Sequence, residues 1–330
     1  MRILTIGGGR FSGRALTGLA LENGHDVTMF HRGSGPDDPW PAAEHVHGDR
    51  ADGFGDLAGR PFDAVLDFCA FYPRQVREAA AAFPDAGRYL FISSISAHTE
   101  GFRAGVTEDQ DVFEPPFPDT EEITWNTYGP LKVASERAAA EAYGDRATVV
   151  RPGYIVGPYD PTDRFTYWVR RATRGGTMIA PAPSDQLLQW IDARDLAAFL
   201  LHLVQAGTPG TFSAIDAPGR YTLDDVIRAS AAAREADTEV VWVDEAFVAA
   251  HELVGTEDGF DPFPMVTPEE PHAHEVSDAR SVAAGLRTRT LEETVVDTLA
   301  WDDERGAPWP MTAGLTSERE AELLAAVDSA

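Results

Sequence analysis

Tyr128 and Lys132 are the residues whose types and spacing point most directly to chemistry. Residues four positions apart lie on one face of a helix, so the phenol and the ammonium would be neighbours. A nearby ammonium favours a phenolate and lowers the pKa of a phenol, which makes tyrosine usable as a proton donor and acceptor near neutral pH. Lys132 is also the single lysine among 27 basic residues, and arginine cannot replace a compact ammonium. The pair predicts a catalytic centre.

Two serines, Ser93 and Ser94, follow the predicted strand 89–92. The carboxyl ends of parallel strands line the ligand crevice of an open α/β sheet. A hydroxyl at that position could hold a substrate oxygen while Tyr128 moves the proton. The alternative is that the two serines are turn residues that bond the local backbone.

A glycine-rich segment occupies residues 7–13, between a predicted strand at 2–6 and a predicted helix at 14–22. Glycines permit a tight turn and a close approach of the backbone to a pyrophosphate at a helix N-terminus. Its place between the first strand and the first helix strengthens what is by itself a weak signal. The predicted cofactor contacts in this segment are Gly7, Gly8, Gly9, Arg10, Phe11 and Gly13.

Arg32 follows the second predicted strand, 26–30, where an acidic residue would bond the ribose 2′-hydroxyl of NAD. An arginine there can accommodate the 2′-phosphate of NADP instead, and Arg10 is a second candidate for phosphate contact. The sequence therefore favours NADP(H), with NAD(H) as the alternative. Either arginine could also be an ordinary solvated surface residue.

The elements that must position these residues alternate along the first half of the chain. Such alternation of strands and helices predicts an α/β protein, with a Rossmann-like doubly wound parallel sheet and a smaller C-terminal substrate lobe. The stretch 98–126 breaks the alternation and is expected to be a long functional loop. The predicted division is a dinucleotide-binding domain at 1–160 with a return segment at about 187–215, and a substrate lobe at 161–186 and 216–330.

The composition limits the partners of the chain. The 330 residues carry 54 acidic side chains and a net charge of −27, which repels nucleic acid and anionic membranes. All but one of the 27 basic residues are arginine, for which codon bias and adaptation to high salt, where acidic surfaces are common, are alternative explanations. The single cysteine, Cys69, excludes an intramolecular disulfide and suits a reducing cytoplasm, and we expect a cytoplasmic protein with a small-molecule substrate. A homodimer stays open.

The glycine turn, Ser94, the Tyr128–Lys132 pair and the segment 151–158 (Arg-Pro-Gly-Tyr-Ile-Val-Gly-Pro) together resemble the short-chain dehydrogenase/reductase superfamily. Within it the chain is similar to the extended or atypical branch, the NAD-dependent epimerase/dehydratase family. The resemblance implies an NAD(P)-dependent oxidoreductase or epimerase that transfers hydride at a carbon bearing a hydroxyl or carbonyl. It implies that Tyr128 is the acid–base, that Lys132 holds the nicotinamide ribose, and that Ser94 orients the substrate. It also implies that Asp49 lies near the adenine and Ala70 along the cofactor.

The chain departs from this family at positions that bear on the substrate. Tyr154 stands where nucleotide-sugar members tend to have asparagine, and Ile95-Ser96 stand where 4,6-dehydratases have Asp-Glu, so dehydration is disfavoured. Arg10 replaces the usual middle glycine. The expected substrate is a sugar or another small hydroxy or keto compound. Net reduction and epimerisation would use the same residues and stay open.

Further substrate contacts are predicted in the second lobe, from Tyr154, Arg164 and Trp168. Aromatic residues there could instead pack the core of the lobe. The run His272-Ala-His274-Glu275 could ligate a metal, but no other ligand signature accompanies it, and no metal is predicted. The alternative function is a non-catalytic, cofactor-sensing scaffold or an RNA-associated relative, against which the intact catalytic residues and the negative charge count.

Overall fold

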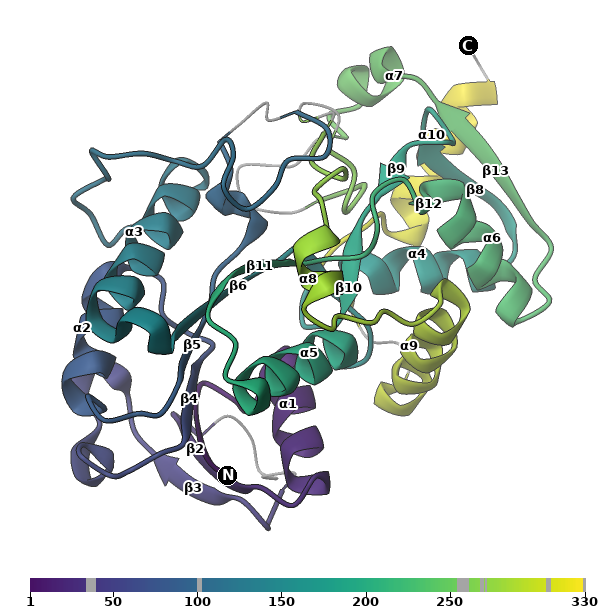
Figure 1. Cartoon of the computed structure of the whole chain (residues 1–330). Helices are drawn as coiled ribbons and strands as arrows, with labels where there is room; N and C mark the ends of the chain where they lie inside the picture. Colours follow the sequence, from purple (N-terminus) through teal and green to yellow (C-terminus); the bar gives the residue numbers. More distant parts are fainter. Residues whose placement is uncertain are drawn as a thin grey trace. The chain divides into compact units, whose positions relative to one another are not determined.

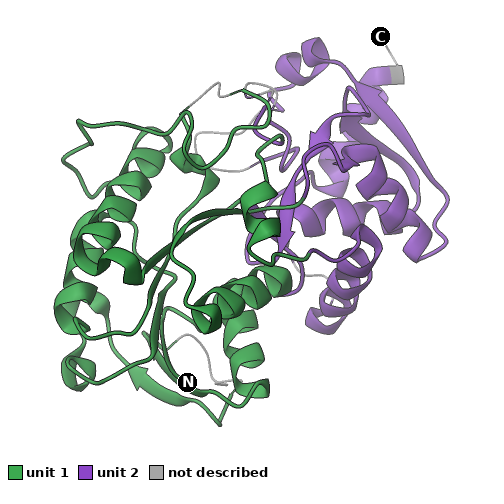
Figure 2. Cartoon of the chain, viewed as in Figure 1, with its two compact units in different colours: residues 1–153, 193–216, 275–287 green, residues 154–192, 217–274, 288–330 purple. Residues whose placement is uncertain are grey.

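The computed structural model describes residues 1–33, 40–99, 103–253, 261–267, 270, 272–306 and 310–328. It contains two compact units, coloured separately in Figure 2. Unit 1 comprises Met1–Gly153, Ala193–Asp216 and Glu275–Arg287, and unit 2 comprises Tyr154–Asp192, Ala217–His274 and Thr288–Ala330. Unit 1 thus includes a late segment, 275–287, that the predicted division placed in the substrate lobe.

Unit 1 is built on a seven-stranded sheet in the order β11-β6-β5-β4-β1-β2-β3, and every neighbouring pair is parallel. This confirms the predicted Rossmann-like doubly wound sheet. The order reverses between β1 and β4, and ligands of such sheets bind at the carboxyl ends of the strands at this point. The strands are β1 Arg2–Ile6, β2 Asp26–His31, β3 Glu44–His47, β4 Ala64–Asp67, β5 Tyr89–Ile92, β6 Ala147–Pro152 and β11 Gly210–Ala214.

Helices cover both faces of this sheet, as Figure 1 shows, with α1 and α5 on one face and α2 and α3 on the other. The strands are therefore buried on both faces, which explains why β1, β4 and β5 are nearly continuous apolar runs. Most of the described part of the 98–126 stretch lacks regular structure, apart from a bridge between His98 and Val112. The helices are α1 Phe11–Glu22, α2 Pro73–Ala82, α3 Trp125–Tyr143, α5 Ala193–Ala206 and α8 Ala279–Ala283, with short 3-10 helices η1 Arg50–Asp52, η2 Gly55–Leu57, η3 Ile95–Ala97 and η4 Gly144–Arg146.

Unit 2 has three two-stranded sheets, in which β7 pairs with β10, β8 with β13 and β9 with β12. Its core gathers aromatic and aliphatic side chains from α4, α6, α9 and α10. None of the described helices in either unit has the length and apolar character needed to cross a membrane. The elements are β7 Tyr154–Val156, β8 Gly176–Pro181, β9 Leu187–Leu188, β10 Trp190–Asp192, β12 Tyr221–Thr222, β13 Thr238–Val243, α4 Arg164–Thr173, α6 Leu223–Ala233, α7 Glu245–Ala250, α9 Leu291–Arg305 and α10 Ser317–Asp328.

Candidate active site

The glycine turn joins β1 to α1 at the switch point of the sheet. Gly7 has a φ of +86°, which favours glycine. A Cβ on Gly8 would lie 2.3 Å from Oγ1 of Thr5, and a Cβ on Gly13 would lie 2.7 Å from the Cα of Gly8. Thr17 fixes the turn by donating a hydrogen bond of 3.2 Å to the Gly8 carbonyl. These glycines are therefore required for the backbone path and the strand–helix packing.

The N-terminus of α1 suits an anion. Arg10 is its N-cap, and no side chain caps the helix there. The first turn of the helix also carries no acidic residue. Free N–H groups and the positive end of the helix dipole together favour a phosphate at this position. The geometry fits the pyrophosphate of a dinucleotide, with Gly9, Arg10 and Phe11 along the entry to the helix.

The structure brings Tyr128 and Lys132 together on α3. Thr124 begins the helix with a capping box, in which its hydroxyl accepts from the Thr127 N–H and the Thr127 hydroxyl accepts from the Thr124 N–H. The Lys132 ammonium then lies 5.7 Å from the centre of the Tyr128 ring. The capping box begins the helix at Trp125, and Pro130 is accommodated within it.

Lys132 is buried without a carboxylate partner. Its Nζ donates to the carbonyls of Ala70 and Ile92, each at 2.9 Å. The rings of Phe71 and Phe91 lie 5.1 and 4.9 Å from it. An ammonium has three N–H groups, so these two bonds leave a third donor for a ligand. Burial lowers the pKa of Lys132 from 10.5 to about 8, against the opposing effect of nearby carboxylates.

Gly129 explains how the Tyr128 helix reaches the Ser94 turn. A Cβ at this position would lie 2.0 Å from the Ser96 carbonyl oxygen and 2.8 Å from the ring of Phe113. Only glycine therefore lets α3 pack this closely on η3. Gly129 was not among the predicted site residues, although its place beside the predicted catalytic tyrosine was a usable signal.

The two serines have different environments. Ser93 is buried, and its hydroxyl donates at 2.5 Å to Glu136, which also forms two bonds with the Arg151 guanidinium at 2.8 and 2.6 Å. Ser94 is partly exposed and caps η3, where its Oγ accepts from the Ser96 N–H at 3.1 Å. Ser93 therefore belongs to a buried polar network, and Ser94 is the serine that a substrate could reach.

The residues predicted to lie near the adenosine or along the cofactor differ in exposure and in their bonding partners. Arg32 is largely exposed after β2, with its Nη1 4.0 Å from a carboxylate oxygen of Asp49. Asp49 also caps η1 by accepting from the Ala51 N–H at 2.9 Å. Ala70 is fully buried and offers its carbonyl to Lys132 rather than its side chain to a cofactor. Arg32 is thus accessible, while the exposed position alone also fits a surface arginine.

A buried ion pair that the sequence did not predict lies at the carboxyl end of β4. Asp67, the last residue of β4, has no exposed surface and accepts from Arg50 at 2.9 and 3.1 Å. The Tyr89 hydroxyl adds a third bond to Asp67 at 2.9 Å. Cys69 lies beside this pair, and burial raises the pKa of its thiol to about 11, so it is an unreactive thiol.

The substrate residues predicted in unit 2 separate into two groups. Trp168 has no exposed surface, and its indole N–H donates to the Pro264 carbonyl at 2.8 Å, so it packs in the core rather than on a surface open to substrate. Tyr154 and Arg164 are partly exposed and stack, with the guanidinium 4.7 Å from the ring centre. These two side chains therefore form a single polar–aromatic unit.

Both ring nitrogens of His274 form hydrogen bonds with backbone groups. Its Nδ1 accepts from the Gln189 N–H at 3.0 Å, so its Nε2 carries the proton and donates to the Met265 carbonyl at 2.9 Å. Burial lowers the pKa of His274 to about 4, which keeps the ring neutral. Within the described ranges, no group of three histidine, cysteine or acidic side chains could hold a metal ion.

The seven-stranded parallel sheet with the glycine turn at its switch point is a Rossmann-like fold. Residues 70–214 match the model of the NAD dependent epimerase/dehydratase family. The predicted resemblance to that family is therefore confirmed.

Known proteins are similar to this chain at low identity. A chloroplast stem-loop binding protein of 41 kDa from Arabidopsis thaliana is 28% identical over 221 residues, which cover 62% of this chain and 55% of that protein. The chain thus spans about half the length of this curated relative.

Solved structures share the fold over nearly the whole chain. The UDP-glucuronic acid 4-epimerase from Bacillus cereus in complex with NAD has a TM-score of 0.64 at 13% identity, covering 94% of this chain and 100% of that one. The UDP-glucose 4-epimerase from Thermotoga maritima has a TM-score of 0.64 at 17% identity, covering 92% and 99%. Identities this low show the fold alone.

Proposed function

We propose that this chain is an NAD(P)-dependent oxidoreductase or epimerase acting on a carbon that bears a hydroxyl or a carbonyl. The observation that carries this proposal is the Lys132 ammonium, held by two backbone carbonyls next to the Tyr128 ring with one N–H to spare. A buried lysine without a carboxylate partner costs stability, and such a cost is typical of functional sites. The family match over residues 70–214 supports the same reading.

Each residue has a defined task in this proposal. The amides of the glycine turn and the N-terminus of α1 hold the pyrophosphate, and the third N–H of Lys132 holds the nicotinamide ribose. The Tyr128 hydroxyl gives a proton to the substrate oxygen or takes one from it, and Lys132 stabilises the phenolate. Ser94 orients the same oxygen. The bound nicotinamide supplies the hydride or accepts it.

The proposed substrate is a small hydroxy or keto compound. Ile95 and Ser96, at the turn after Ser94, offer no carboxylate for dehydration. Net reduction and epimerisation need the same groups. Epimerisation results if an oxidised intermediate stays bound and is reduced on its other face. The test is to incubate the purified chain with reduced cofactor and a panel of aldehydes, ketones and nucleotide sugars. No turnover and no cofactor binding would contradict the proposal.

The preferred cofactor in this proposal is NADP(H). Arg32 is exposed at the end of β2, where a 2′-phosphate would lie, and among the described residues it forms a long ion pair of 4.0 Å with Asp49. Charge-assisted bonds to a phosphate contribute roughly 1.5–3 kcal/mol, so we expect at least tenfold tighter binding of NADP(H) than of NAD(H). Calorimetric titration of both cofactors tests this, with Arg32→Ala removing the preference. Equal or tighter binding of NAD(H) would overturn it.

A second candidate function is RNA binding, because one relative is named a stem-loop binding protein. The net charge of −27 opposes it, since binding to a phosphate backbone depends on basic surface. An electrophoretic shift with a stem-loop RNA at low salt distinguishes the two. We expect no shift below micromolar RNA concentrations.

A further inference from the structure

Three exposed apolar side chains lie on the two segments that contribute to the Tyr128–Lys132 site, the start of α3 and the residues after β4, and the chemistry proposed above does not use them. Trp125 is 74% exposed, Ile123 43% and Phe71 39%. Scattered single apolar residues on a surface need no explanation, but a group of them beside polar reactive residues is typical of a ligand site. We therefore ask whether they form one surface with the phenol.

Trp125 is fixed relative to Tyr128. It is the first residue of α3, and the capping box of Thr124 and Thr127 holds this first turn. Residues three apart on a helix lie on the same face, so the indole continues the face that carries the phenol. The large exposed ring therefore lies one helical turn from the proposed proton donor.

Phe71 approaches the pair from another element. It follows Ala70, whose carbonyl binds the Lys132 ammonium, and its own ring centre lies 5.1 Å from that ammonium. The ring of Tyr128 lies 5.7 Å from the same nitrogen. The rings of Phe71 and Tyr128 therefore both lie within 6 Å of the same ammonium.

An ion pair joins the two segments that carry these rings. Arg74, near the start of α2, donates to both carboxylate oxygens of Glu121, at 2.6 and 3.0 Å. Arg74 comes three residues after Phe71, and Glu121 comes two residues before Ile123. The pair therefore links the segment that carries Phe71 to the segment that carries Ile123.

We propose that Phe71, Ile123 and Trp125 form an apolar substrate-binding surface, and that the substrate carries an aromatic or branched apolar group on its reacting carbonyl carbon. This inference rests on the proposed function, because it assigns the substrate of the same site. An aromatic group gains from stacking on an indole and a phenyl ring, whereas a polyol would lose hydration against them. The site therefore selects an aromatic ketone over a polyhydroxylated one.

The test compares acetophenone with dihydroxyacetone as substrates, using the reduced cofactor that binds more tightly. We expect kcat/KM for acetophenone to be at least about tenfold higher. Trp125→Ala should raise the KM for acetophenone about tenfold with kcat within about threefold, because it removes binding and not chemistry. Trp125→Phe should restore most of the affinity. Val296→Ala, which trims an exposed apolar residue of α9 in unit 2, is the matched control and should change neither constant.

Two further measurements separate this inference from the proposed function. Ligand-observed NMR of acetophenone with Tyr128→Phe and with Tyr128→Phe/Trp125→Ala reports binding without turnover. If nothing in the substrate panel is turned over and no cofactor binds, the proposed function fails, while a loss of the acetophenone signal on removing Trp125 still supports the apolar surface. An unchanged KM or NMR signal in Trp125→Ala overturns the inference. Sedimentation velocity tests whether a second copy of the chain binds this surface instead. A dimer that dissociates in Trp125→Ala would show that it does, and would also overturn the inference.

Discussion

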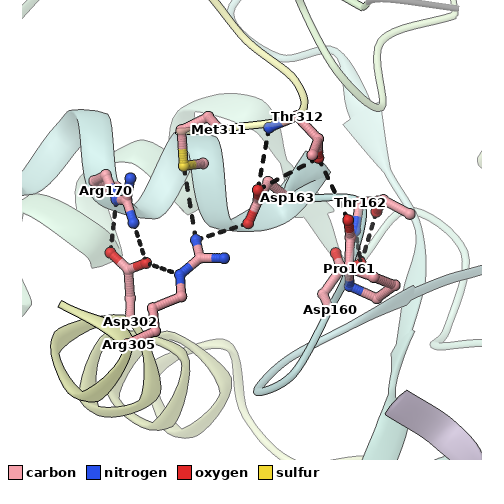
Figure 3. Close-up of polar contacts among 9 residues, drawn as sticks. All are labelled: Asp160, Pro161, Thr162, Asp163, Arg170, Asp302, Arg305, Met311 and Thr312. Carbon is pink, nitrogen blue, oxygen red and sulfur yellow. Dashed lines mark hydrogen bonds and ion pairs between the residues drawn. The ribbon is translucent and has the colours of Figure 1, made fainter. Parts of the chain in front are cut away.

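Two cations with little exposed surface, Lys132 in unit 1 and Arg305 in unit 2, have different partners. In unit 1 the Lys132 ammonium meets two carbonyl oxygens and aromatic rings. In unit 2 the Arg305 guanidinium meets two carboxylates, Asp163 at 2.7 Å and Asp302 at 2.7 Å, in the network that Figure 3 shows. Burial is thus common to both cations, and charge compensation is what separates them.

The unit 2 network has the properties of a structural clamp. Asp163 precedes α4 and accepts from the Thr312 N–H at 3.1 Å, and Arg170 on α4 pairs with Asp302 on α9. The network therefore ties α4, α9 and the segment before α10 to one another. The two guanidinium groups of this network, Arg170 and Arg305, each face a carboxylate.

The Lys132 site has the opposite character. Carbonyl dipoles and ring faces stabilise an ammonium less than a carboxylate does, so burial lowers its pKa to about 8. Such a group keeps a donor and a variable charge for a ligand. The comparison teaches that a buried cation indicates function when its partners are neutral, and structure when they are charged.

The largest effect should come from the phenol beside this lysine. Tyr128→Phe should lower kcat about 10²–10⁴-fold and leave cofactor affinity within about threefold, because it removes the proton carrier and keeps the ring. Tyr143→Phe is the matched control on the same helix, since its buried hydroxyl donates to the Phe83 carbonyl at 3.2 Å. It should cost stability and keep kcat. Steady-state kinetics with cofactor titration decides this, and a fully active Tyr128→Phe enzyme would remove the mechanism.

The next effect tests the clamp in unit 2. Asp163→Asn keeps the shape of the side chain but leaves Arg305 with one carboxylate, and it should lower the free energy of unfolding by about 3 kcal/mol. Glu322→Gln breaks an exposed pair with Arg319 and should cost under about 1 kcal/mol. Urea denaturation measures both. Turnover per folded molecule should stay unchanged, and a large loss of kcat in Asp163→Asn would assign unit 2's network to the site.

Local pattern explains what the sequence could predict. The strands of the sheet follow from apolar runs, and the Tyr128–Lys132 contact follows from helical spacing. Partners that lie far along the chain left no such signal. The two carbonyls that bind Lys132 come from residues 62 and 40 positions away, and Arg305 is 142 positions from Asp163. Nor could composition tell that Trp168 packs in a core while Trp125 is exposed, because both are aromatic residues on helices.

A third prediction uses the pH dependence of stability to test whether the partners of Lys132 are neutral. The pKa of Lys132 is about 8 when folded and 10.5 when unfolded. Between these values the unfolded chain binds more protons, so the free energy of unfolding should rise with pH. The rise attributable to Lys132 should be about 2 kcal/mol between pH 8 and 10, taken as the difference from Lys132→Met. An equal pH dependence in the two proteins would mean that Lys132 keeps its ordinary pKa.

The smallest expected effect concerns salt and sharpens the contrast between buried and exposed charge. The Debye length falls from about 30 Å at 0.01 M to about 3 Å at 1 M salt, but buried pairs are screened far less than exposed ones. The cost of Asp163→Asn should therefore change by less than about 0.5 kcal/mol between 0.01 and 1 M KCl. The small cost of Glu322→Gln should disappear over the same range, because that pair lies in solvent. The wild-type melting temperature should rise with salt, since screening relieves the repulsion of a chain with a net charge of −27. If the cost of Asp163→Asn fell with salt as that of Glu322→Gln does, water would reach the Arg305 network, and the distinction between a closed clamp and an open, ligand-ready lysine would not hold.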